Sequence, residues 1–130
     1  MKKALYLLLC AIMMTGCQES LSDRAAREAK EYTKKNCPIV ISPVMTLDSM
    51  TFDKGTTTFT HYYTVSGVAD DQAHVDQVKD KMRADLNTEL HANTSLRIFK
   101  DAGYAYRYIM LSQSSGKTLF DTTLKKEDYQ

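Results

Sequence analysis

The sequence predicts an α+β domain in the order helix, hairpin, helix, hairpin, with a four-stranded antiparallel sheet covered on one face by helices. Residues 46–52 and 56–66 alternate apolar and polar side chains on either side of a short turn, which is typical of a β-hairpin. Residues 104–112 and 117–124 repeat this pattern. Between the two pairs, apolar residues recur every three or four positions, which indicates a helix.

The first helix is expected just before the first hairpin. Either Ser20 or Ser22 would cap it, and its interior, residues 23–35, is rich in Ala, Glu, Lys and Arg. Pro38 ends it, because proline restricts the residue before it and cannot donate to the hydrogen-bond ladder. The apolar side chains form a narrow line, so the helix would pack through one stripe: Leu21, Ala25, Ala29 and Tyr32.

The second helix opens at Asp70-Asp71 and runs for about 20 residues. Acidic residues in its first turn complement the helix dipole. Residues 95–102 fit a short helix, with a strand as the alternative, and Gly103 stands where a left-handed residue ends a helix. The apolar stripe of the long helix is Val75, Val78, Met82, Leu86 and Leu90.

Three tyrosines, Tyr104, Tyr106 and Tyr108, project from one face of the third strand. If that face is open, together with His61 they form a candidate binding surface, because exposed aromatic rings stack on sugars and anchor protein partners. If helices cover it, the same side chains belong to the core. His61 itself is either a half-buried histidine with satisfied hydrogen bonds or a catalytic base.

The N-terminus has the pattern of a secretory signal. Lys2 and Lys3 precede an apolar run of about 11 residues, whereas a membrane-spanning helix needs roughly 20. We therefore expect residues 1–16 to be a signal peptide, residues 17–22 to be a modified N-terminus and short tether, and residues 23–130 to form a single domain.

The segment Met14-Thr15-Gly16-Cys17 resembles the lipobox of bacterial lipoproteins. The resemblance implies that the Cys17 thiol is diacylated, that the chain is cut before it, and that the new amine is acylated, for example with palmitate. Because each buried methylene contributes about 0.8 kcal/mol, three chains would hold the protein firmly on a bilayer. The expected location is a Gram-negative envelope, lipid-anchored at the outer membrane on its periplasmic or surface face.

A further pattern covers most of the remaining chain: Ala29, Asn36-Cys37-Pro38, Leu47-Asp48-Ser49, Tyr62-Tyr63, Gly103, Tyr106, Gly116-Lys117 and Glu127-Asp128. It resembles a group of small bacterial lipoproteins and secreted domains of unknown function. That resemblance implies a structural pattern and no catalytic residue. Some members carry a second cysteine in the long helix or near the end, which this chain lacks, so the resemblance assigns no disulfide to Cys37.

Charge and motifs argue against several functions. Loss of Lys2 and Lys3 reduces 17 basic residues to 15, against 16 acidic ones, so nucleic acid is not an expected partner. The histidines do not have the spacing of metal ligands, so we expect no metal site. We also expect no catalytic residue and no cofactor. The segment 115–118 matches the end of a P-loop but lies in a hairpin turn. Cys37 fits a small buried hydrophobe, with a reactive thiol as the alternative.

These observations predict a membrane-anchored binding or accessory module whose partners are the lipid bilayer, through acylated Cys17, and another envelope protein. A tether would raise the local concentration of such a module without any catalytic group. The alternative is a small-ligand receptor, for sugar or lipid, or a small enzyme that uses His61 with nearby tyrosines or Cys37.

Overall fold

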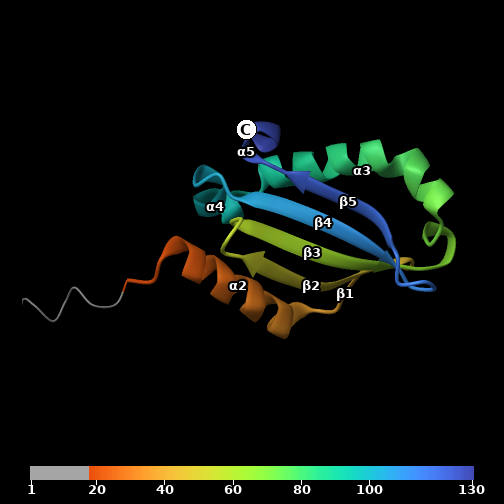
Figure 1. The fold of residues 1–130 in the computed structure, drawn as a ribbon, viewed down its shortest axis with the longest axis horizontal. Coiled ribbons are helices and arrows are strands. Elements are labelled where there is room, and N and C mark those ends of the chain that lie inside the picture. Colours follow the sequence, from red (N-terminus) through yellow and green to blue (C-terminus); the bar gives the residue numbers. More distant parts are fainter. Residues whose placement is uncertain (1–17) are drawn as a thin grey trace, which may run out of the picture.

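The computed structural model describes residues 18–130, so the expected signal peptide and Cys17 lie outside the described residues. The described chain forms one five-stranded sheet with helices packed on it (Figure 1). Its elements are α2 (Leu21–Asn36), β1 (Ile39–Ser42), β2 (Met45–Asp53), β3 (Thr58–Val65), η2 (Gly67–Ala69), α3 (Gln72–Ala92), η3 (Thr94–Leu96), α4 (Arg97–Asp101), β4 (Ala105–Ser112), β5 (Thr118–Leu124) and α5 (Lys126–Tyr129).

The predicted α+β class and both hairpins are confirmed, but the predicted four-stranded antiparallel sheet is wrong. The sheet has five strands in the order β1-β2-β3-β4-β5, and β3 and β4 run parallel. The other neighbouring pairs are antiparallel. The crossover through α3 explains the parallel pair. This helix has 21 residues and spans roughly 32 Å, enough to carry the chain back along the sheet so that β4 starts beside the start of β3.

Two short elements were not predicted. Strand β1 is only four residues long and pairs with the start of β2, Ile39 opposite Leu47. Its apolar side chains do not alternate in burial, since Val40 is 75% exposed and Ile41 is also exposed, so it lacks the sequence pattern of a strand. Helix α5 is a single turn whose buried Tyr129 holds the C-terminus against the core, a tertiary contact with no local signal.

Capping residues define the two long helices. Ser20 accepts a hydrogen bond from the backbone N–H of Asp23, and α2 therefore begins at Leu21, two residues before the expected domain start. Asp71 caps α3 in the same way, through the N–H of Ala73. Gly103, with φ of 81°, follows α4 in the left-handed conformation expected for it.

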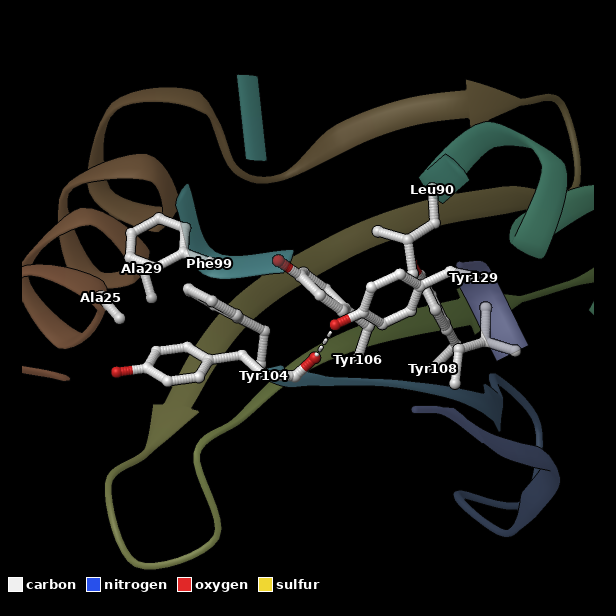
Figure 2. Close-up of a cluster of buried hydrophobic side chains, with 10 residues drawn as sticks. Ala25, Ala29, Leu90, Phe99, Tyr104, Tyr106, Tyr108 and Tyr129 are labelled. Carbon is white, nitrogen blue, oxygen red and sulfur yellow. Dashed lines mark hydrogen bonds between the residues drawn. The ribbon is translucent and has the colours of Figure 1, made fainter. Parts of the chain in front are cut away.

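The helices lie on one side of the sheet, which we call the helix face; the opposite side is the helix-free face. Ala25 and Ala29 of α2 approach the sheet closely because they have no bulk, and Phe99 of α4 and Leu90 of α3 complete the cover (Figure 2). A second cluster, under the start of α3, joins Val65, Val75, Met110 and Phe120. Each of the two clusters takes residues from both hairpins.

Candidate functional site

The three tyrosines of the predicted binding surface lie in the core. Tyr104 and Tyr108 are each 7% exposed and Tyr106 is 1% exposed, because all three lie on the helix face (Figure 2). The Tyr104 ring stacks on Phe99 of α4 with centroids 5.8 Å apart. The covered alternative is therefore the one found, and the open row of phenols is corrected to a structural cluster.

His61 lies on the same face of β3 and is partly buried. Its ring stacks on that of Tyr108, with centroids 4.8 Å apart and planes 14° apart, and its Nδ1 is buried without a hydrogen-bond partner among the described residues. Burial lowers its pKa to about 4, so the ring is neutral at pH 7. A base with so low a pKa has little driving force for proton transfer at neutral pH.

Cys37 and the other histidines do not assemble a second site. The Cys37 thiol is partly buried, and burial, together with the nearby Asp48 carboxylate, raises its pKa, which favours the unreactive thiol. His74 is exposed on α3, and the Nδ1 of His91 lies 2.7 Å from the Tyr129 carbonyl oxygen. Across residues 18–130, no group of three metal-ligating side chains comes together.

The most distinctive surface feature is a groove between α2 and β2, which we call the α2–β2 groove. It exists because β1 pairs with β2 only as far as Leu47. Beyond that point the outer edge of β2 faces α2, leaving a hollow of about 550 Å³. Its apolar lining comes from Ala26 and Ala29 on the helix and from Met50 and Phe52 on the strand.

Thr33 determines how α2 and β2 meet. Its hydroxyl accepts a hydrogen bond from the Met50 N–H at 2.9 Å and donates one to the Met50 carbonyl at 2.8 Å. Both backbone groups point outward from the sheet, so a single hydroxyl satisfies an edge that would otherwise be open to another strand. The Thr33 side chain thereby fixes one wall of the α2–β2 groove against the other.

Two lysines give the α2–β2 groove a positive rim. Lys30 and Lys34 are exposed and line it, and neither forms an ion pair within residues 18–130. By contrast, the arginines of the first turns of α2 are paired: Arg24 with Glu28, and Arg27 with Glu19. Two of the unpaired basic side chains of α2 therefore lie beside the apolar lining.

The helix-free face carries a second, polar hollow of about 510 Å³. At its centre Arg107 and Asp121 form a two-pronged ion pair, with Nε–Oδ1 and Nη2–Oδ2 distances of 2.9 and 2.6 Å. This contact lowers the pKa of the Asp121 carboxyl. Thr58, Thr60 and Thr123 also line this hollow.

Comparison with known proteins supports a family assignment. The model of the family described as Domain of unknown function (DUF8479) matches residues 20–120. The chain belongs to this family. No curated protein sequence matches the chain.

Solved structures share the fold of this DUF8479 domain at low sequence identity. A Pseudomonas aeruginosa protein described as secreted (PA3611) has a TM-score of 0.69 at 14% identity and covers 87% of this chain and 100% of its own. The pilotin EpsS of the Vibrio vulnificus type 2 secretion system has a TM-score of 0.62 at 13% identity, over 82% and 89%. The type II secretion system pilotin AspS of Vibrio cholerae has a TM-score of 0.57 at 17% identity, over 81% and 88%. These values establish a common fold.

Sequence reasoning did not identify the groove of this DUF8479 domain. The sequence pattern that could have indicated it is the pair of small residues Ala26 and Ala29 beside Lys30 and Lys34. The same pattern is equally typical of an ordinary solvent-exposed helix. Where β1 stops could not be read from the sequence, and that position creates the groove. Among residues 18–130, no helix is both long and apolar enough to span a bilayer.

Proposed function

We propose that this protein is a lipid-anchored accessory module of the bacterial cell envelope that holds a segment of a partner protein in the α2–β2 groove. The observation that carries the proposal is the coincidence of an apolar hollow with two unpaired lysines at one rim. Apolar lining supplies affinity through burial, and the charges select the partner. The pilotins among the proteins of the same fold support an accessory role in the envelope.

The charge and shape of the groove define the class of partner. An apolar side chain would lie against Ala26, Met50 and Phe52, which are partly buried in the free protein. Carboxylates flanking that side chain would approach Lys30 and Lys34, whose ammonium groups lack a partner within the described chain. The expected ligand is therefore an apolar protein segment with acidic neighbours, and basic segments would be rejected by like-charge repulsion.

A site-directed photo-crosslinking experiment in cells tests the groove. A benzophenone side chain at position 34 reports on the rim, and the same group at position 81, exposed on α3, is the matched control. We expect a discrete crosslinked protein from position 34 only. Ala26→Trp should abolish that product by filling the groove, whereas Ala73→Trp, at an exposed site on α3, should leave it unchanged.

Charge reversal gives a second test of the groove, one that does not depend on filling it. Lys30→Glu, made in the protein that carries the benzophenone at position 34, changes one exposed side chain, so folding should be preserved. The crosslinked product should fall sharply in this variant. Equal crosslinking from positions 34 and 81, or a product indifferent to both sets of substitutions, would show that the groove is not the partner site.

The lipid anchor is a separate part of the proposal and has its own test. The Met14-Thr15-Gly16-Cys17 segment motivates it. Cys17→Ser should leave the precursor uncut and release no mature form, and intact-mass measurement of the native protein should find the acyl chains on Cys17. A native N-terminus without lipid would remove the anchor while leaving the groove experiment valid.

A second candidate function is the binding of a hydroxyl-rich ligand at the polar hollow of the helix-free face. The Arg107–Asp121 pair and the threonine hydroxyls present both donors and acceptors there, as recognition of a sugar requires. Binding of neutral oligosaccharides that is lost in Arg107→Ala and kept in Lys30→Glu would favour this candidate. The same measurement without binding would leave the α2–β2 groove as the functional site.

A further inference from the structure

The start of α2 defines the end of the domain that lies nearest to the proposed anchor. Only Gln18, Glu19 and Ser20 separate Cys17 from Leu21, the first residue of the helix. A fully extended chain spans at most about 3.3–3.6 Å per residue, so Leu21 lies within roughly 14 Å of an acylated Cys17. If Cys17 carries lipid, as proposed above, the first turn of α2 must lie close to the bilayer surface.

Helix α4 shares that end of the molecule. Ser22 Oγ lies 3.0 Å from the Tyr104 hydroxyl, and the Arg24 guanidinium lies 5.9 Å from the centroid of the Phe99 ring. Phe99 belongs to α4, and Tyr104 lies three residues after Asp101, the last residue of that helix. Figure 1 shows α4 beside the N-terminal end of α2 and far from η2 and the start of α3. A bilayer within reach of Leu21 is therefore also within reach of α4.

The exposed side of α4 combines an apolar side chain with basic ones. The helix has five residues, and the apolar side chain of Ile98 is 45% exposed. The Arg97 side chain is 81% exposed, and its distance of 3.7 Å to Asp101 leaves it free to take another partner. Lys100 and Lys126 lie with Arg97 around a hollow of about 640 Å³ between α4 and the C-terminal turn. The Lys100 ammonium donates to the carbonyls of Leu90 and His91, and that of Lys126 donates to the carbonyl of Asp101.

The acidic groups at this end do not cancel these charges. Glu19 is paired with Arg27, and Asp23 with Lys54, so the start of α2 is close to neutral. Asp101 is the carboxylate that lines the hollow with the three basic side chains. A net positive surface with an exposed branched apolar residue matches the interface of a bilayer that contains anionic phospholipid.

We propose that the α4 face, defined by Arg97, Ile98, Lys100 and Lys126, rests on the phospholipid headgroups when Cys17 is lipidated. Ile98 enters the interfacial region, and the exposed Arg97 guanidinium lies near phosphate groups. Lys100 and Lys126 keep their contacts with backbone carbonyls and add positive potential. The inference rests on the lipid anchor of the proposed function and adds an orientation to it. The α2–β2 groove, lined by residues 26–34 further along the helix, stays accessible to a partner.

The absence of tryptophan from the sequence gives this orientation a clean test. Ile98→Trp places a single fluorescent reporter on the α4 face, and Val68→Trp is the matched control, because Val68 in η2 is 78% exposed at the opposite end of β3. The full-length lipidated protein is reconstituted into vesicles of equal parts phosphatidylcholine and phosphatidylglycerol, with and without brominated acyl chains. We expect bromine to quench Trp emission in the Ile98→Trp variant and to leave the Val68→Trp variant unchanged.

Three outcomes overturn the inference and can be told apart. Vesicle-bound protein in which both reporters are quenched equally, or neither is, overturns the orientation and leaves the anchor in place. Protein that stays in the supernatant removes the anchor and the orientation together. Adding Arg97→Glu to Ile98→Trp should weaken quenching in the anionic vesicles and have little effect in phosphatidylcholine alone; equal effects in both would exclude the headgroup contact.

Discussion

The hydroxyl of Thr33 in α2 makes two hydrogen bonds with the backbone of Met50 in β2, at 2.9 Å to the N–H and 2.8 Å to the carbonyl. A side chain thus takes the place of a neighbouring strand at the point where β1 ends. Side chains also bind the backbone at the far edge of the sheet: on β5, Gln72 donates to the Leu119 carbonyl and Arg83 to the Thr123 carbonyl. Side chains from helices therefore occupy both edges of this small sheet.

Removal of the Thr33 hydroxyl should destabilise the domain. Thr33→Val keeps the shape but leaves the N–H and carbonyl of Met50 unpaired in a partly buried site, which should cost about 1–3 kcal/mol in the free energy of unfolding. Urea denaturation measures this, with Thr33→Ser as the control that retains the hydroxyl. No loss in Thr33→Val would contradict a role for the hydrogen bonds, and a loss confined to Thr33→Ser would assign the effect to the methyl group.

The C-terminal turn should contribute to stability through Tyr129. Its hydroxyl donates to the Tyr104 carbonyl at 2.8 Å, the contact drawn in Figure 2, and its ring is buried against Tyr106. Tyr129→Phe should cost about 1 kcal/mol through the lost hydrogen bond. Tyr129→Ala should cost about 3–5 kcal/mol, because it also leaves a cavity. Thermal and urea unfolding measure both, and Tyr32→Phe, at an exposed site, should be neutral.

Histidine 61 should make stability depend on pH. Burial lowers its pKa from 6.5 to about 4, so between these values the unfolded chain binds a proton that the folded chain does not. Stability should therefore fall as the pH drops from about 6.5 to about 4, by up to roughly 3 kcal/mol from this residue. Below pH 4 this residue adds no further loss.

The matched variants for this pH effect are His61→Phe and His74→Gln. His61→Phe keeps a ring against Tyr108 but cannot titrate, so the difference in unfolding free energy between pH 7 and pH 4.5 should shrink. His74 is exposed, and His74→Gln should leave that difference unchanged. The same pH difference in wild type and His61→Phe would assign the acid sensitivity to carboxylates instead.

The Arg107–Asp121 pair should add little to stability. Both side chains are substantially exposed, and such pairs contribute about 0.2–1 kcal/mol, less at high salt. Arg107 lowers the pKa of Asp121, so the contribution is present above the unfolded carboxyl pKa and is lost as the pH falls through the folded value. A double-mutant cycle with Arg107→Gln and Asp121→Asn at low and high salt measures it; a coupling that resists salt would indicate a stronger, shielded pair.

The sequence predicted the elements well wherever a repeating pattern was long enough. The alternation in β3 placed Phe59 and Val65 on one core-facing side, and the apolar period of α3 placed Val75 and Leu90 on another, and all four are buried. Strand β1 and helix α5 were not predicted, because four residues are too few to show a periodic pattern of apolar side chains. The parallel pairing of β3 with β4 was not predicted because it depends on the path of α3 across the sheet, and no local pattern encodes that path.

Local patterning by itself determined the α+β class, the caps of the helices and the turns of the hairpins, since these depend on residues close together in the chain. Only the tertiary structure decided that Tyr104, Tyr106 and Tyr108 are covered, because two faces of a strand look alike until a helix lies on one of them. It also decided where a partner could bind: the α2–β2 groove arises where one strand stops short of its neighbour, and that depends on contacts between Thr33 and Met50, distant in sequence.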